Sequence, residues 1–314
     1  MAATRTMKRI PDPSKCPSAL LPDPLLRERL RLHIREVRGQ AEVVERLGQA
    51  VLRREFQTTP NRGPRGAFIF AGPTGVGKTM LARNLAAALF GPNRLVRFDC
   101  SEFKTLASYQ ALFGDRSGDA GRLAQAFVQA SAGVWVFDEI EKAHGEMVNL
   151  FLQAVDAARL TLANGQTLDL SSIYFILTTN LGSAAILGRE HLPFASLEAH
   201  VSRAVERWLS PELRGRFGRP FVFRPLSREV QREIAAGHLE AVVAWNAAQG
   251  REIAIHPDVL PFLQHRGFSA RLGARPVLQI IEEFVGNAIA NDLVEGGPGS
   301  GLIVMEGDQL KLTR

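Results

Sequence analysis

Five short apolar runs alternate with longer segments of helical periodicity through the middle of the chain. The runs are rich in β-branched and aromatic residues, and they cover residues 66–72, 95–100, 134–139, 173–180 and 220–225. Strands that are apolar on both faces are typical of a parallel sheet covered by helices. The pattern therefore predicts an α/β fold in which helices sandwich a five-stranded parallel sheet.

The segments that flank the predicted sheet differ from it in composition and periodicity. Residues 1–24 contain five prolines and little periodicity, which indicates a flexible arm. Residues 25–56 show helical spacing interrupted by a glycine turn, which predicts two helices. Helical segments resume after the last strand and end in a short strand pair near the carboxyl end. We therefore expect a large domain over residues 25–225 and a small, mainly helical domain over residues 226–314.

Composition narrows the class of protein. No run approaches the roughly 18 apolar residues of a membrane span, and the first residues lack the apolar core of a secretion signal. The only cysteines, Cys16 and Cys100, lie far apart, which favours a reduced, cytoplasmic setting. The net charge of +6 leaves an acidic partner such as nucleic acid open, although the basic residues are scattered among acids.

The first candidate site is the segment GPTGVGKT, which follows the first apolar run and opens a helical segment. It matches GxxxxGK[ST], in which glycines let backbone N–H groups point at phosphate oxygens and the helix N-terminus adds a positive field. Lys78 is then placed to bridge the β- and γ-phosphates, and Thr79 to ligate Mg²⁺. The residues expected to hold ATP here are Gly72, Pro73, Thr74, Gly75, Val76, Gly77, Lys78, Thr79 and Met80.

The second candidate is VWVFDEIEKAH, residues 134–144, where an apolar strand ends in two acids. Asp138 is placed to hold the Mg²⁺ shell. Glu139 is placed to orient or deprotonate an attacking water, which a hydrolase needs and a simple binding protein does not. Together the two motifs predict Mg²⁺-dependent ATP hydrolysis.

With these motifs in place, the chain resembles the Clp family of AAA+ ATPases, specifically their carboxy-terminal ATPase module. Further family-like phrases are VRGQAEVV, DCSEF, TTNLGS, PELRGRFGRPFVFRPL and GARP, so that the resemblance runs from about residue 32 to the end. It implies a P-loop fold with a helical lid and a homo-oligomer, most naturally a hexameric ring. It also implies that Val37 and Gly39 pack around the adenine.

The resemblance assigns three further residues. Asn180 is similar to sensor 1, which helps to place the water near the γ-phosphate; taken alone, it could equally cap a helix. Arg275 is similar to sensor 2, which reaches the nucleotide from the small domain. Arg216 is similar to the arginine finger that one subunit inserts into its neighbour's site. Arg214 and Arg219 compete for that role, because the motif reads GR where the family usually has NR.

The segment GDRSGDAG, residues 114–121, departs from the family pattern. Threading members carry a Gly–aromatic–Val–Gly paddle here, whereas this segment has no aromatic residue that could press on a polypeptide side chain. Either Arg116 contacts an acidic or phosphate-bearing partner, or the loop is a solvated turn. A second pore element is predicted at residues 159–170, as a hairpin with Asn164–Gly165 at its turn.

Three functions are compatible with these observations. The leading one is an ATP-driven ring that remodels a protein or protein complex without the standard aromatic paddle. The alternatives are a nucleic-acid-associated loader or switch, and an accessory ATPase of a secretion or mobile-element apparatus. A protease partner is disfavoured, because we find no convincing docking tripeptide. On the sequence as given, we expect neither a second ATPase module nor a folded amino-terminal substrate domain.

Overall fold

The computed structural model describes residues 25–56, 63–116, 119–187, 189 and 192–313. The arm predicted for residues 1–24 lies outside these ranges. Contacts between Cα atoms divide the chain into two units. The first unit comprises the described residues up to Ala71, together with Lys78–Gly182 and Val201–Val222. The second comprises Gly72–Gly77, Ser183–His200 and the described residues from Phe223 onward.

The first unit is built on a parallel sheet of five strands, in the order β2-β3-β6-β1-β7. The strands are β1 (Gly66–Ala71), β2 (Leu95–Asp99), β3 (Gly133–Asp138), β6 (Ile173–Thr179) and β7 (Phe221–Val222). The predicted parallel sheet is therefore confirmed. The last strand is shorter than the expected 220–225: it pairs with β1 only at Phe221 and Val222, and Pro220 before it has no N–H to donate to the sheet.

A row of aromatic rings crosses the sheet and forms part of its core. Phe98 of β2 stacks on Phe137 of β3 with ring centroids 4.6 Å apart, and Phe137 stacks on Phe175 of β6 at 5.9 Å. Helix α6 (Met147–Ala157) adds Phe151, whose ring meets that of Phe137 edge-on at 5.1 Å. All four side chains are buried. This packing holds the carboxyl ends of β2, β3 and β6 close together.

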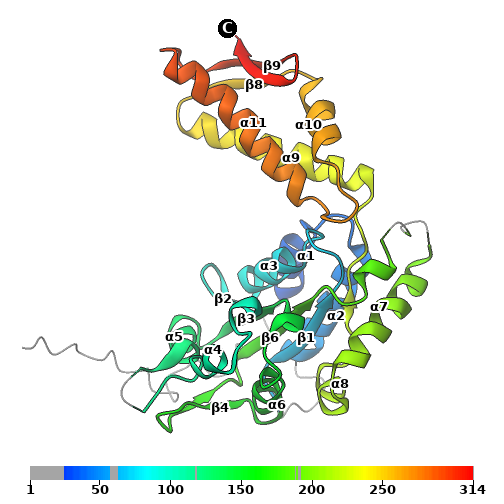
Figure 1. The fold of residues 1–314 in the computed structure, drawn as a ribbon, viewed down its shortest axis with the longest axis vertical. Coiled ribbons are helices and arrows are strands. Elements are labelled where there is room, and N and C mark those ends of the chain that lie inside the picture. Colours follow the sequence, from blue (N-terminus) through cyan, green and yellow to red (C-terminus); the bar gives the residue numbers. More distant parts are fainter. Residues whose placement is uncertain (1–24, 57–62, 117–118, 188, 190–191, 314) are drawn as a thin grey trace, which may run out of the picture. The chain divides into compact units, whose positions relative to one another are not determined.

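Helices cover the sheet in the first unit (Figure 1). Helix α3 packs against β3, and α1 packs against α3. The two helices predicted before the sheet are confirmed as α1 and α2. The bounds are α1 (Leu26–Ile34), α2 (Ala41–Glu55), α3 (Lys78–Phe90), α4 (Leu106–Gln110), α5 (Gly121–Gln129) and α8 (Pro211–Phe217). Helix α7 (Phe194–Trp208) contains residues assigned to both units.

Short elements complete the first unit. The predicted hairpin is confirmed, because β4 (Arg159–Thr161) pairs antiparallel with β5 (Thr167–Asp169). Single turns of 3₁₀-helix follow three strands of the main sheet. They are η2 (Cys100–Glu102) and η3 (Ile140–Lys142) in the first unit, and η4 (Ser183–Ala185), whose residues belong to the second unit.

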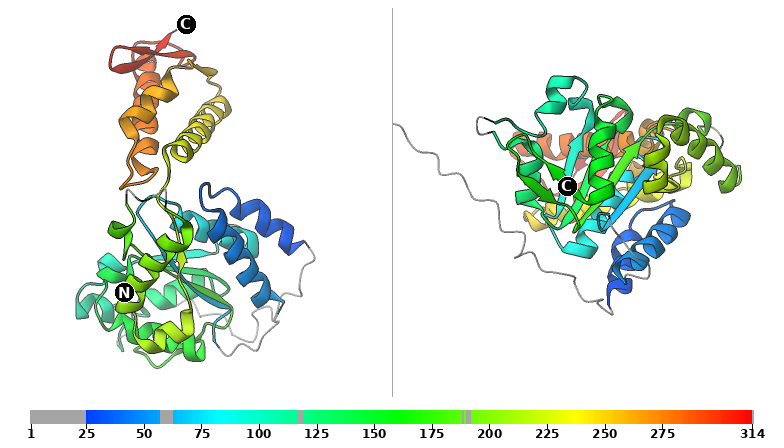
Figure 2. Two further views of the ribbon diagram at one scale, coloured as in Figure 1. Left: turned by 90° about the vertical axis from the view of Figure 1, so that its right-hand side faces the viewer. Right: turned by 90° about the horizontal axis from the view of Figure 1, so that it is seen from below.

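The second unit contains three helices and a three-stranded sheet, which can be followed in Figure 2. The helices are α9 (Arg228–Ala248), α10 (Val259–Gly267) and α11 (Arg275–Val294), and the strands are β8 (Ile253–Ile255), β9 (Gly301–Glu306) and β10 (Gln309–Thr313). The terminal strand pair matches the prediction. Strand β8 was not predicted, because its three residues are too few to show a period. None of the helices in the described ranges has the length and hydrophobicity that crossing a bilayer requires.

Candidate nucleotide site

The predicted phosphate loop connects β1 to the first residue of α3. Its glycines adopt positive φ angles of 148° at Gly72, 73° at Gly75 and 102° at Gly77, a region that side chains rarely allow. A Cβ atom at Gly72 would also lie only 2.5 Å from the carbonyl oxygen of Phe223, in the same unit. The loop conformation therefore requires glycine, and it leads directly into the N-terminus of a helix, as an anion site does.

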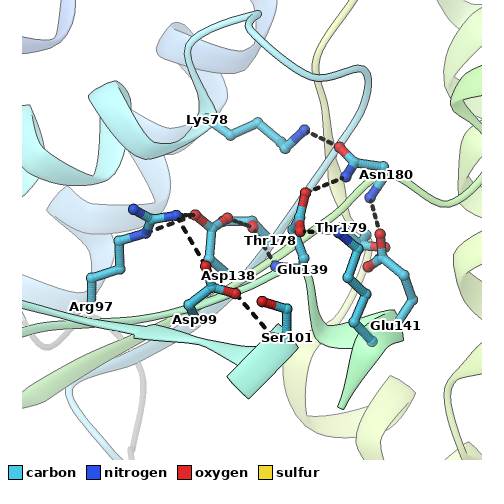
Figure 3. A network of polar contacts seen from close by, with 11 residues as sticks. Lys78, Arg97, Asp99, Ser101, Asp138, Glu139, Glu141, Thr178, Thr179 and Asn180 are labelled. Atoms are coloured by element: carbon cyan, nitrogen blue, oxygen red, sulfur yellow. Dashed lines mark hydrogen bonds and ion pairs between the residues drawn. The ribbon is translucent and has the colours of Figure 1, made fainter. Parts of the chain in front are cut away.

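Three of the predicted site residues, each from a different element, form one chain of hydrogen bonds (Figure 3). The Lys78 ammonium donates to Oδ1 of Asn180 at 2.8 Å, and Nδ2 of Asn180 donates to Oε1 of Glu139 at 3.2 Å. Lys78 is 8% exposed, so its charge is largely removed from water. The Asn180 amide thus bridges a cation and a carboxylate, and two charge-assisted hydrogen bonds hold the three side chains together.

Asp138 ends β3 and is buried. Its carboxylate accepts from the Thr178 hydroxyl and from the Arg97 guanidinium, whose Nη2 lies 2.7 Å and Nε 2.9 Å from Oδ2. Asp138 and the Thr79 hydroxyl are hard oxygen donors. Mg²⁺ is commonly bound by one or two protein oxygens, with water and phosphate completing its shell. The chemistry of the two donors therefore fits Mg²⁺.

Glu139 stands in left-handed backbone, with φ 57° and ψ 53°. Its N–H donates to Thr178 Oγ1 at 3.1 Å, which fixes the turn at the end of β3. Its Oε2 lies 2.6 Å from the Lys142 ammonium, and this hydrogen bond raises the pKa of Lys142. A left-handed conformation at a residue with a side chain costs free energy and persists where the surroundings impose it, often at functional sites.

Sequence reasoning missed four residues of this network. Arg97, Thr178, Glu141 and Lys142 all contact predicted site residues or the backbone beside them. Thr178, Glu141 and Lys142 lie inside quoted motifs. The hydrogen bonds of Thr178 to the Glu139 N–H and of Glu141 to the Asn180 N–H each join residues 39 positions apart. Only the alignment of β3 with β6 reveals these contacts. For Glu141 and Lys142 the available signal was their place directly after a buried strand, whereas Arg97 and Thr178 are polar residues within the apolar runs of β2 and β6.

The remaining predicted residues are not part of this hydrogen-bonded chain. Arg216 is on α8, and its Nε lies 2.6 Å from Oδ1 of Asp156 at the end of α6. Its competitors Arg214 and Arg219 are also exposed. Arg275 begins α11, and the N–H of the preceding residue, Ala274, donates to the carbonyl of Gly75 within the second unit.

The two residues expected near the adenine lie between α1 and α2. Val37 is 5% exposed, and Gly39 has a φ of 73°. Glycine is favoured at such an angle because it has no Cβ.

The unusual loop is closed by its own backbone. The N–H of Asp115 donates to the carbonyl of Asp119 at 2.9 Å, and the N–H of Asp119 returns a bond to Oδ1 of Asp115. Just before the loop, the carbonyl of Phe113 accepts from the N–H of Ala163 in the hairpin connection at 3.1 Å. The loop and the hairpin are therefore linked. Residues 117–118 lie outside the described ranges, and Arg116 is exposed.

The fold and the site together define a class. A glycine-rich loop between the first strand and a helix, an acidic pair at the end of a neighbouring strand, and a helical second unit are the features of an AAA+ P-loop ATPase. Residues 63–219 match the family described as AAA domain (Cdc48 subfamily), and residues 226–304 match the C-terminal, D2-small domain of ClpB protein. The chain belongs to the AAA+ ATPases of the Clp family.

Curated relatives are chaperones of this family. The chain is 35% identical over 286 residues to the chaperone protein ClpB of Meiothermus ruber, covering 88% of this chain and 33% of that protein. It is 34% identical over 278 residues to heat shock protein 100 of Trypanosoma brucei brucei, covering 86% and 32%. The chain thus spans about a third of the length of these relatives.

A solved structure is also similar. It is Hsp104 in a closed state with ATPγS and FITC casein, with a TM-score of 0.80 and 27% sequence identity. The similarity covers 92% of this chain and 51% of that one. The match supports the P-loop fold assigned above.

Proposed function

We propose that this protein binds and hydrolyses ATP with Mg²⁺. The observation that carries the proposal is the hydrogen-bonded chain from Lys78 through Asn180 to Glu139. It joins the phosphate-loop lysine, a polar residue after the central strand and an acid after the neighbouring strand. A site that cleaves a phosphoanhydride needs these three functions: charge stabilisation, placement of water and activation of water.

Each residue has a role in this proposal. The backbone of residues 72–77 and the Lys78 ammonium hold the phosphates, while Val37 and Gly39 pack around the adenine. Thr79 and Asp138 would hold Mg²⁺, which supplies charge neutralisation at the phosphates when bound. Glu139 orients and deprotonates the water, and Asn180 holds that water near the γ-phosphate.

We further propose that the active form is a homo-oligomeric ring, most naturally a hexamer, that remodels a protein or protein complex. Arg216 acts as the finger in the neighbouring site, and Arg275 reports the nucleotide state from the small domain. Relatives named as chaperones and the Hsp104 structure with casein support a protein substrate. The domain boundaries that we propose are 25–225 and 226–314.

The loop at residues 114–121 leads us to propose that the ring works without an aromatic paddle. Its backbone bonds and its link to the hairpin favour a compact turn, and its side chains offer no large apolar contact area. A cytoplasmic location and the absence of a protease partner stay predictions; two of the relatives are named as chloroplastic.

The test measures ATP turnover by the purified protein with added unfolded protein, and separately with single- and double-stranded nucleic acid at two salt concentrations. We expect stimulation by protein, and loss of ATP binding in Lys78→Ala, seen as loss of thermal stabilisation by ATP. Absence of turnover in every condition would refute the proposal.

The net charge of +6 keeps a nucleic-acid-associated loader or switch as the second candidate. Its signature is stimulation by nucleic acid that fades as salt rises, because phosphate contacts release counterions. The same assay separates the two candidates. An accessory role in a larger secretion or mobile-element apparatus would be indicated by turnover that neither ligand stimulates.

A further inference from the structure

The side chain of Glu141 links β3 to β6 beyond the last backbone pair of these two strands. It lies in the turn η3 directly after β3, and its carboxylate accepts from two groups at the end of β6. The Thr179 hydroxyl donates to Oε2 at 2.7 Å, and the Asn180 N–H donates to Oε1 at 3.0 Å. Both oxygens of one carboxylate therefore bind adjacent residues of the neighbouring strand (Figure 3).

The register of the sheet shows why this contact matters. Pairing between β3 and β6 ends at Phe137 opposite Leu177. Beyond that pair, side chains continue the connection: Thr178 bonds Asp138 and the N–H of Glu139. The carboxylate of Glu141 is the last link in this series, and it holds the turn of β3 against the end of β6.

This link sets the position of Asn180. Its side-chain amide lies between the Lys78 ammonium and Glu139, but a side chain keeps such a place only where its own backbone is fixed. The bond from the Asn180 N–H to Glu141 fixes that backbone, and hydrogen bonds to a carboxylate are stronger than neutral ones. Glu141 thereby couples the turn that carries Glu139 to the residue that carries the amide.

We propose that Glu141 is a positioning residue for ATP hydrolysis, one that holds Asn180 and Glu139 in the relative placement that the reaction needs. The proposal rests on the proposed function of this site. We assign Glu141 no proton transfer: its two oxygens hold the Thr179 hydroxyl and the Asn180 N–H at the end of β6. Its action is on the geometry of its neighbours, so it affects turnover more than nucleotide binding.

The experiment compares Glu141→Ala, Glu141→Gln and the control Glu146→Ala in the full chain. Glu146 is an exposed carboxylate five positions along, which accepts only from Asn149 among its described side-chain partners, at 2.6 Å. We expect kcat to fall roughly tenfold or more in Glu141→Ala, because small displacements of reacting groups are costly. KM and the Kd for ATP should stay near wild type. The amide oxygen of Glu141→Gln can accept from the Asn180 N–H, so this variant should recover much of the rate.

A second readout does not depend on activity. Hydrogen exchange at the Asn180 amide should accelerate in Glu141→Ala and stay unchanged in Glu146→Ala, because only the first loses the acceptor of that N–H. Should Glu141→Ala fail to fold, Glu141→Asp replaces it; its shorter side chain keeps the charge but cannot span both donors, so an intermediate kcat is expected.

The outcomes are distinct. Wild-type kcat in a folded Glu141→Ala overturns the positioning role while leaving the proposed ATPase intact. A parallel loss of kcat, ATP affinity and thermal stability also overturns it, since that pattern marks a structural role. If the wild-type protein itself shows no turnover, the proposed function fails and this inference fails with it.

Discussion

At the scale of single residues, the site depends on polar side chains that are buried away from water. Lys78 and Asp138 are ionisable side chains that are buried, and each is hydrogen-bonded. Lys78 donates to the amide oxygen of Asn180, and Asp138 accepts from the Arg97 guanidinium. A buried charge without such a partner would be strongly destabilising. The backbone contributes as well, because Glu139 is held in a left-handed conformation by its turn. Chemistry at this site is therefore sensitive to single-atom changes.

Glu139→Gln tests the role of the carboxylate. The amide is nearly the same size and keeps an oxygen for the Asn180 contact, but it cannot take a proton from water. We expect ATP to bind and turnover to fall by about 10²–10⁴-fold, the usual contribution of a general base. Steady-state turnover and binding of a fluorescent ATP analogue measure the two effects. Near-normal turnover would remove Glu139 from its proposed role.

At the scale of elements, the five strands and most helices followed from periodicity, because two-sided burial leaves a continuous apolar run. Periodicity did not show which side chains form hydrogen bonds between the ends of different elements. At the amino end of β6, Tyr174 donates to Glu55 of α2 at 2.6 Å, and Arg65 binds the same carboxylate through two nitrogens. Burial, together with the Glu55 charge, raises the pKa of Tyr174 well above its usual value.

This partly buried cluster gives a stability prediction. Glu55→Ala removes the shared acceptor and leaves the Arg65 guanidinium without its carboxylate, so we expect a loss of about 3–5 kcal/mol. Tyr174→Phe removes one hydrogen bond and keeps the ion pair, so a loss of about 1–2 kcal/mol is expected. Urea unfolding followed by circular dichroism measures both.

The matched control is Glu45→Ala on the same helix, whose carboxylate accepts from exposed Gln49. A surface change of this kind should alter stability by about 0.5 kcal/mol or less. Equal losses for Glu55→Ala and Glu45→Ala would show that the cluster does not stabilise the fold.

The candidate site was partly predictable at this same scale. Lys78 and Asp138 could be predicted as site residues because their motifs are local: a loop or a strand end places them whatever the rest of the chain does. Glu141 and Arg97 were not found, because their partners come from neighbouring strands and depend on register. A helix cap was an open alternative for Asn180; in the structure its amide joins Lys78 to Glu139.

At the scale of the whole molecule, the residue proposed as the arginine finger, Arg216, would act in the site of a second subunit. Arg216 is half-exposed and pairs with Asp156 on the surface of the first unit. An exposed ion pair of this kind contributes little to stability, so it can be exchanged for another partner without a large cost. That property suits an arginine proposed to act in a neighbouring site.

Arg216→Ala tests the shared-site proposal. We expect ATP binding to persist and turnover to fall by about 10³-fold or more, the range for loss of an arginine finger. In the unaltered protein, turnover per subunit should rise with protein concentration as rings assemble. Arg214→Ala on the same helix is the control and should stay active. If Arg214→Ala is the inactive variant, the finger is assigned to the wrong residue; concentration-independent turnover would contradict the ring.

The sequence by itself determined the type and order of the main elements, the phosphate loop and the acidic pair, because each depends on residues close together along the chain. Only the tertiary structure decided which side chains share a hydrogen bond at the ends of the strands. Those contacts arise from the register of β3 against β2 and β6, and register is a property of packing between segments far apart in sequence.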